Sequence, residues 1–174
     1  MEKLKKDTEK LCSFYVSDWH LVTMILPYIN QKLNEKANVI TLLENDIENN
    51  IKILTSKLNL RNEEEILKID WKMCKESKIE EKLQNLKQQK NTSNIIFVNG
   101  SKSYINSANK IVDACITNNS EKTKQGVVKV VNCYEVTEFN ESIKEILNSH
   151  DRILNTSGER NIEDLFNGYK RKMA

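Results

Sequence analysis

The chain has 174 residues, and its 27 basic and 25 acidic residues leave a net charge of +2, with both signs mixed along most of the predicted helices. Hydrophobic residues make up 39% and charged residues 30% of the chain, and one proline with four glycines excludes a collagen-like or low-complexity protein. The balanced charge also disfavours a nucleic-acid-binding domain, which normally carries a basic stripe. We expect a single domain over residues 1–174, with its core at about 11–158 and a C-terminal helix at 159–174.

Nothing in the sequence predicts a membrane protein. The longest apolar stretch, residues 21–29, is interrupted by Thr23 and Pro27 and is far shorter than the roughly 20 residues that a membrane span needs. Residues 1–10 carry alternating charges and no signal or lipidation motif. We therefore expect a cytoplasmic protein.

The first third of the chain alternates short strands with helices. Residues 11–16 (LCSFYV) are β-prone and lead into Ser17 and Asp18, which are favoured N-cap residues. Apolar residues then recur every three or four positions over 19–36, which predicts a helix that Pro27 should kink or restart. A nearly all-apolar strand, 38–43 (NVITLL), precedes a helix that is capped by residues 44–46 and ends at Leu58.

The middle of the chain is clear only in part. Within the highly charged stretch 59–91, residues 66–71 (ILKIDW) have strand character and the apolar spacing from Ile79 predicts an amphipathic helix ending near Lys90. The clearest strand is 94–99 (NIIFVN), which turns at Gly100 into a helix. Strand, turn and helix follow one another directly here.

The last third continues the alternation. The polar stretch 117–126 is a loop by composition, and 127–134 (VVKVVNCY) is a buried strand. The chain then closes with a helix at 140–148, a short strand at 152–155 and a terminal helix from Asn161. This order predicts right-handed βαβ crossovers, and hence a three-layer α/β fold whose mostly parallel central sheet has helices on both faces.

In such folds ligands bind outside the carboxyl ends of the strands, so the residues that follow each strand are the first place to look. Those residues are Ser17, Asp18, Glu44, Asn45, Asn99, Gly100, Ser101, Tyr134 and Glu135.

Four segments, in chain order, carry a resemblance to a known family: FYVSDWHLVTMILPYI, NVITLLEND, NIIFVNGS and VVNCYEVTEFNESIKEILNSHDRILNTSG. They resemble the MEDS domain, the methanogen/methylotroph DcmR sensory domain, over roughly residues 11–158. The closing segment of that family is matched by Asn132, Cys133, Tyr134, Phe139 and His150. The Gly and His that usually precede the first strand of the family are absent here.

The resemblance implies a RecA/KaiC-like α/β fold, related to P-loop NTPases, without a working Walker A phosphate loop. It implies a non-catalytic sensory or signalling domain that binds a small molecule at the C-terminal ends of the parallel strands. Such domains sense small hydrocarbon derivatives or metabolites and are often fused to DNA-binding or kinase modules, none of which is visible in this chain. We expect no cofactor, no metal, no nucleic acid and no membrane contact. A small-molecule ligand, a separate signalling protein and a second copy of the chain are the partners to consider.

The first candidate site is the turn Asn99, Gly100, Ser101, Lys102, Ser103. Free backbone N–H groups at the start of a helix can hold an anion, Gly100 permits close approach, and Lys102 beside Ser103 could neutralise a phosphate. However, the full GxxxxGK[ST] spacing is missing. The alternative is that Asn99 and Gly100 make the turn while Ser101 caps the helix.

The second candidate is the cluster Tyr15, Asp18, Trp19 and His20, where the first strand meets its helix. An aromatic wall with one carboxylate and one imidazole suits an apolar ligand with a polar group. The alternative is ordinary packing, in which Asp18 caps the helix and Trp19 covers the sheet edge.

The third candidate combines Cys133, Tyr134 and Glu135 with His150. A thiol and an imidazole could form a nucleophile and its base, but Cys133 lies in a strongly apolar strand, so a buried, inert thiol is the better interpretation. Tyr134 and Glu135, at the end of the strand, are better placed to touch a ligand. The four cysteines have no zinc-like spacing: Cys12, Cys74, Cys115 and Cys133.

Two other functions remain open at this point. One is a nucleotide-binding protein or weak NTPase of RecA-like fold, with Lys102 and Ser103 on the phosphates. The other is an interaction or adaptor protein without a ligand, docking through amphipathic helices at 59–90 or 159–174. A sensor is favoured because the catalytic residues of an enzyme are missing.

Overall fold

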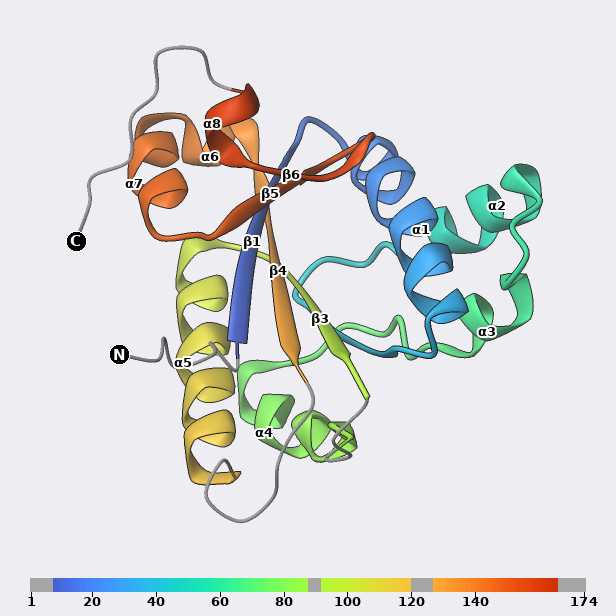
Figure 1. Cartoon of the computed structure of the whole chain (residues 1–174), viewed down its shortest axis with the longest axis horizontal. Helices are drawn as coiled ribbons and strands as arrows, with labels where there is room; N and C mark the ends of the chain where they lie inside the picture. The colour runs from blue at the N-terminus through green and yellow to red at the C-terminus, as the bar shows by residue number, and fades with distance from the viewer. Residues whose placement is uncertain (1–7, 88–91, 120–126, 166–174) are drawn as a thin grey trace, which may run out of the picture.

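A computed structural model describes residues 8–87, 92–119 and 127–165 of the chain (Figure 1). Its centre is one sheet of six strands in the order β2-β3-β4-β1-β5-β6. Neighbouring strands are parallel except for β5 and β6, which form an antiparallel pair. The strands are β1 (Thr8–Tyr15), β2 (Asn38–Leu43), β3 (Asn94–Asn99), β4 (Val128–Glu135), β5 (Arg152–Asn155) and β6 (Gly158–Arg160).

Helices cover both faces of this sheet, as the sequence predicts for an α/β fold (Figure 1). One face packs against α1 (Asp18–Asn34), α2 (Glu48–Leu58) and α3 (Glu63–Lys68). The opposite face packs against α4 (Ile79–Lys82), α5 (Lys102–Asn119), α6 (Val136–Phe139), α7 (Ile143–Asn148) and α8 (Ile162–Leu165). Short 3-10 turns complete the chain: η1 (Glu76–Lys78), η2 (Leu83–Asn85) and η3 (Asn140–Ser142). Within the described residues no helix is long and apolar enough to cross a membrane.

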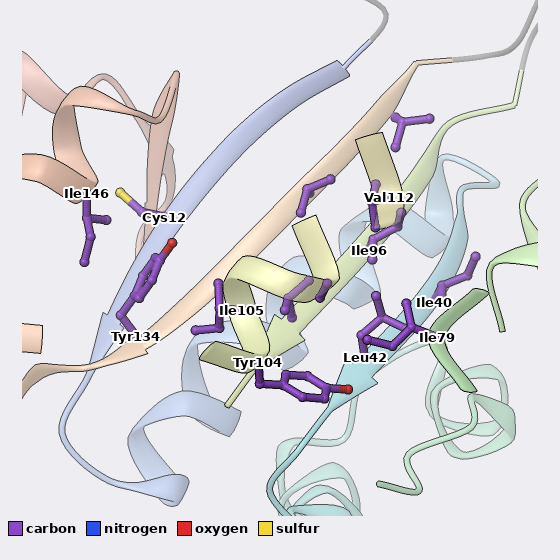
Figure 2. Close-up of a cluster of buried hydrophobic side chains, with 14 of the residues drawn as sticks. Cys12, Ile40, Leu42, Ile79, Ile96, Tyr104, Ile105, Val112, Tyr134 and Ile146 are labelled. Atoms are coloured by element: carbon purple, nitrogen blue, oxygen red, sulfur yellow. The ribbon is translucent and has the colours of Figure 1, made fainter. Parts of the chain in front are cut away.

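Alternating residues of the strands supply the two cores. On β3, Ile96 and Val98 face α5, whereas Ile95 and Phe97 face α1. Figure 2 shows the α5 side, where Tyr104, Ile105 and Val112 lie against the sheet. All six residues of β3 are buried, which explains why its sequence is a continuous apolar run with Asn only at its two ends.

After the two central strands, β1 and β4, the chain continues on opposite faces of the sheet. β1 is followed by α1 on one face, and its neighbour β4 is followed by α6 and α7 on the other. Where adjacent parallel strands diverge in this way, their loops part and leave a crevice at the carboxyl edge of the sheet. The topology therefore makes the carboxyl edge between β1 and β4 the first place to look for a candidate site.

Residues 66–71, which have strand character in the sequence, form no strand in the structure. Ile66 to Lys68 complete helix α3, whose first turn holds Glu63, Glu64 and Glu65, residues that the helix dipole favours. Ile66 is fully buried against the α1 side of the sheet, and its carbonyl accepts the indole N–H of Trp71 at 2.8 Å. Tertiary burial of one apolar residue and one indole ring therefore outweighs the local β-propensity.

Of the two effects predicted for Pro27, a kink or a restart, the restart does not occur, because α1 runs from Asp18 to Asn34 without a break. Proline removes one backbone hydrogen bond, but Pro27 itself is exposed. The buried residues of α1 lie on both sides of it: Leu21, Val22, Met24, Ile25, Leu26, Tyr28 and Ile29. Packing against the sheet therefore holds both halves of the helix in place.

Two predicted helices are shorter than expected. The helix from Ile79 contains only four residues before it tightens into η2, and residues 88–90 of the prediction lie outside the described part of the chain. The helix at 140–148 begins as η3 and becomes α-helical at Ile143. The predicted loop at 117–126 is helical up to Asn119, and residues 120–126 are not described.

The C-terminal helix does not begin at 159, because Gly158–Arg160 forms β6, whereas the start at Asn161 predicted from the alternation of strands and helices is one residue from the observed start at Ile162. The side chain of Glu159 explains this pairing: it accepts the Tyr28 hydroxyl at 2.7 Å and the Lys129 ammonium at 3.0 Å. Burial works to raise the pKa of Glu159, but these hydrogen bonds and the charges of Lys129 and Lys32 outweigh it and hold the pKa below its ordinary value. The helix starts at Ile162, and residues 166–174 are outside the described range.

Candidate functional site

A hollow of about 510 Å³ opens at the carboxyl edge of the sheet, where β1 and β4 diverge. Three loops contribute to it: the turn after β1, the turn after β2, and the residues at the end of β4. Its lining consists of Tyr15, Val16, Ser17, Asp18, Asn45, Asp46, Glu135 and Glu138. Of the residues selected from the sequence, the structure brings Tyr15, Asp18 and Glu135 together here.

Asn99 fixes the floor of this hollow. It is the last residue of β3, is buried, and its amide nitrogen donates to the Tyr15 hydroxyl at 2.6 Å and to the Cys133 carbonyl at 3.3 Å. Its amide oxygen accepts a hydrogen bond from Asn45 at 3.1 Å. One side chain thereby links the ends of β1 and β4 to the loop after β2. Burial raises the pKa of Tyr15 to about 12, so its hydroxyl is neutral at physiological pH.

The turn between β1 and α1 is fixed by two side chains. The Ser17 hydroxyl accepts the backbone N–H of His20 at 3.1 Å, which is an N-cap hydrogen bond. His20 in turn accepts the Val16 N–H on Nδ1 at 3.0 Å, so its ring closes the turn. The helix cap is therefore Ser17 and not Asp18, whose exposed carboxylate lines the hollow.

Val16, in the lining of the hollow, and Trp19, which follows Asp18 in the first turn of α1, are exposed apolar residues. The side chain of Trp19 is 48% exposed and that of Val16 is 66% exposed. Trp19 is therefore not a buried packing residue. Large apolar side chains left open next to a concavity are a feature of binding surfaces.

The end of β4 supplies a fixed negative charge. The Glu135 carboxylate accepts the Thr137 hydroxyl and the Glu138 N–H, the latter at 2.9 Å, and so caps α6. The hydrogen bond from Thr137 is the main reason that the pKa of Glu135 is lowered. Asp18, Asp46 and Glu138 add further carboxylates to the lining. Such a hollow attracts positively charged groups and repels phosphate.

The first turn of α5 already holds an anion of its own. The Glu44 carboxylate accepts the Ser101 N–H at 2.7 Å, and the Ser101 hydroxyl accepts the Tyr104 N–H at 3.2 Å. A Cβ atom on Gly100 would lie 2.8 Å from both the Cβ and Oε1 atoms of Glu44, so glycine is needed for this close approach. The helix start that a phosphate would use is satisfied by a side chain. Lys102 and Ser103 are exposed and do not line the hollow.

Cys133 and His150 lie on opposite faces of the sheet. Cys133 packs in the core on the α1 side, and burial raises the pKa of its thiol to about 12. His150 lies near the aromatic cluster on the other side, where Tyr134 packs edge-on against Phe139 with ring centroids 4.8 Å apart. A thiol–imidazole pair is excluded by this geometry. Tyr134 is buried in the same cluster and lies outside the hollow.

His150 belongs to a buried polar network that the sequence does not reveal. Its Nδ1 atom donates to the Ile146 carbonyl at 2.6 Å, because a carbonyl can only accept. Nε2 is then an acceptor, and it lies 3.1 Å from the amide nitrogen of Asn132 and 3.3 Å from the Tyr134 hydroxyl. Asn132 also exchanges two hydrogen bonds with Asn109. These contacts fix α5 and α7 to β4, which is a structural role.

Several residues of the hollow were not selected as site residues from the sequence. Ser17 and Asn45 are among the residues after strands that the sequence marks as the first place to look, although no candidate site was built on them, whereas Val16, Asp46 and Glu138 carry no motif. Within residues 8–87, 92–119 and 127–165, no three His, Cys, Asp or Glu side chains form a group that could hold a metal ion.

Comparison with known proteins gives no further assignment: no protein-family model matches the chain, and no curated protein and no solved structure matches it.

Proposed function

We propose that this chain is a non-catalytic sensory domain that binds a small molecule in the hollow at the carboxyl edge of its sheet. The observation that carries the proposal is the position of the hollow, at the divergence of β1 and β4, where parallel α/β folds bind ligands. Its volume of about 510 Å³ falls within the range of small-molecule sites. The resemblance of the sequence to the MEDS sensory domain supports the same proposed function.

The chemistry of the lining favours a ligand with a positively charged group. Four carboxylates, from Asp18, Asp46, Glu135 and Glu138, surround a floor to which Tyr15 contributes. Because they come from three different loops, their charges add in the hollow and attract an amine or guanidine group. Trp19, which follows the lining residue Asp18 in α1 and is exposed, offers an apolar surface and a cation–π partner for the rest of such a ligand.

Nucleotide binding, as a RecA-like fold would suggest, is less well supported. A triphosphate at this edge would meet the carboxylates of the hollow instead of lysines or free amides. At the start of α5, it would have to displace Glu44 from the Ser101 N–H. Repulsion by these carboxylates and displacement of Glu44 are both electrostatically unfavourable for a triphosphate. At the start of α5, Lys102 supplies only one exposed positive charge to compensate.

A bound ligand would contact the beginnings of two helices that pack on opposite faces of the sheet. Ser17 and Asp18 start α1, whereas Glu135 caps α6. A molecule that bridges them changes the restraints on both faces at once, which is a route from binding to a surface that a signalling partner can read.

The experiment is a thermal-shift screen of the purified chain with small amines, guanidines, hydrocarbon derivatives and ATP, followed by calorimetry on each hit. We expect an amine-bearing compound to raise Tm, because a ligand that binds only the folded state stabilises it. The variant Asp18→Asn with Glu138→Gln should lose this shift, and Glu141→Gln, an exposed carboxylate that does not line the hollow, should keep it. No stabilising compound, or an ATP shift insensitive to these carboxylates, would contradict the proposal.

A further inference from the structure

Lys82, the last residue of α4, is an unusual lysine because most of its side chain is buried. Only 12% of the side chain is exposed, although lysine is almost never buried without a partner. It lies beyond the edge strand β2, where the extended segment after α3 passes over the edge of the sheet. The backbone N–H of Cys74 in that segment donates to the Leu43 carbonyl at 2.7 Å. This region is separate from the hollow at the carboxyl edge, with which it shares no lining residue.

The partners of Lys82 do not use its full hydrogen-bonding capacity. Its ammonium donates to the Thr41 hydroxyl at 2.9 Å and to the Asp70 carbonyl at 3.2 Å. An ammonium has three N–H donors, and no third acceptor is found among the described residues. The nearest opposite charge, the Asp70 carboxylate, is 3.8 Å away and 62% exposed, so water screens it. Lys82 therefore has a donor and a charge left for a ligand.

Two adjoining hollows meet at Lys82. One has a volume of about 680 Å³ and lies between the 70–75 segment and α4, and the other, of about 460 Å³, runs along the edge of β2. Asp70, Lys82 and Asn85 line both. Together the two hollows have six lysines in their lining: Lys68, Lys72, Lys75, Lys78, Lys82 and Lys87. They have only three acids: Glu65, Asp70 and Glu81.

This excess of positive charge is local. The hollows carry three more lysines than acids, whereas the whole chain has a net charge of +2. Lys78 pairs with Glu81 at 3.6 Å, but both side chains are exposed and the pair contributes little. Lys72 and Lys75 form no ion pair with any described residue. Burial lowers the pKa of Lys82, against the opposing effect of Asp70, which is the response of a cation that lacks a close counter-charge.

We propose that the hollow between the 70–75 segment and α4 is a binding site for the phosphate group of a small molecule, with Lys82 as its anchor. The third N–H of Lys82 donates to a phosphate oxygen, while Lys72 and Lys75 supply charge from the rim. Lysine serves as a point charge for phosphate, and this hollow alone has four lysines and two acids in its lining, an excess of two positive charges that suits a dianion better than a single carboxylate. The group can come from free phosphate or from a phosphate monoester, since both present the same oxygens.

The test is calorimetric titration of the full chain with inorganic phosphate and, separately, with glycerol 3-phosphate, at constant ionic strength. We expect saturable binding of at least one of them, which chloride at the same ionic strength does not reproduce. Lys82→Met keeps the apolar stem and removes the charge, so affinity should fall roughly tenfold or more, as expected for a charge-assisted hydrogen bond. Lys52→Met removes an exposed lysine of α2 on the other face of the sheet, and affinity should be unchanged.

The rim provides a second variant that leaves the buried contacts intact. Lys72→Met with Lys75→Met removes two exposed charges and should weaken binding by several-fold, even if Lys82→Met fails to fold. Binding of phosphate alone identifies a free-anion site, and binding of glycerol 3-phosphate with higher affinity identifies a monoester site. No binding above the chloride control, or unchanged affinity in both lysine variants, would overturn the proposal.

Discussion

Asn99 is the residue on which the geometry of the carboxyl edge depends most, and Asn99→Ala tests this. The substitution removes the donor to the Tyr15 hydroxyl and to the Cys133 carbonyl, and the acceptor for Asn45. Asn45 is exposed and can turn to water, but the Tyr15 hydroxyl is buried and loses its partner.

The expected magnitude follows from these contacts. A buried polar group left without a partner costs about 1–3 kcal/mol, and the truncated side chain adds the loss of its own packing. We expect Asn99→Ala to lower the free energy of unfolding by about 3 kcal/mol. For a chain of this size that corresponds to a fall in Tm of roughly 6–12 °C.

The assay is urea unfolding followed by circular dichroism, with Asn106→Ala as the control. Asn106 is an exposed residue of α5, so its replacement should change stability by less than about 0.5 kcal/mol. A double-mutant cycle with Tyr15→Phe isolates the hydrogen bond: the two effects should be non-additive by about 1 kcal/mol. Stability of Asn99→Ala within about 0.5 kcal/mol of the wild type would refute the reasoning.

Three further predictions concern the rest of the fold. Gly100→Ala should cost about 1–3 kcal/mol in urea unfolding, because its methyl group would lie 2.8 Å from Glu44; an unchanged midpoint would contradict this. Glu159→Gln should cost roughly 2 kcal/mol at pH 7. Because the folded pKa of Glu159 is lowered, its stabilisation is present above the unfolded pKa of about 4.3 and is lost as the pH falls through the folded value, so the stability difference between wild type and variant should shrink as the pH falls below about 4.3. A stability difference constant from pH 7 to pH 3 would disprove that linkage. Iodoacetamide at pH 8, with peptide mapping, should label the half-buried Cys115 well before Cys133, whose thiol pKa is about 12; equal rates would show that Cys133 is accessible.

The fold class could be predicted because the buried strands are continuous apolar runs. Residues 94–99 and 128–135 are recognisable without any tertiary information, since strands covered on both faces need apolar residues at almost every position. β6 could not be predicted, because it has three residues with two charges and depends on the contacts of Glu159. Residues 66–71 are the reverse case: they look like a strand in the sequence, but their apolar residues are there because Ile66 buries one face of helix α3 and Trp71 buries its indole ring.

The sequence predicts where the candidate site lies, but not which side chains line it. The rule that ligands bind after strands selects Asp18 and Glu135, and both line the hollow. It also selects Tyr134, whose side chain turns into the core on the α7 side, because the direction of a strand residue depends on register that the sequence does not specify. The hydrogen bond from the Ser101 N–H, at the start of α5, to the Glu44 carboxylate could not be predicted. Glu44 and Ser101 lie 57 positions apart in the chain and meet only because β2 pairs with β3.

The measurement that tests the central claim most directly is a backbone amide NMR titration of the full chain with the amine that stabilises it most. The account predicts that the largest shifts fall on residues 16–18, 45–46 and 135–138, with the indole signal of Trp19 affected as well. Shifts at Lys102 and Ser103 with ATP, and none at the carboxyl-edge hollow with any amine, would contradict it.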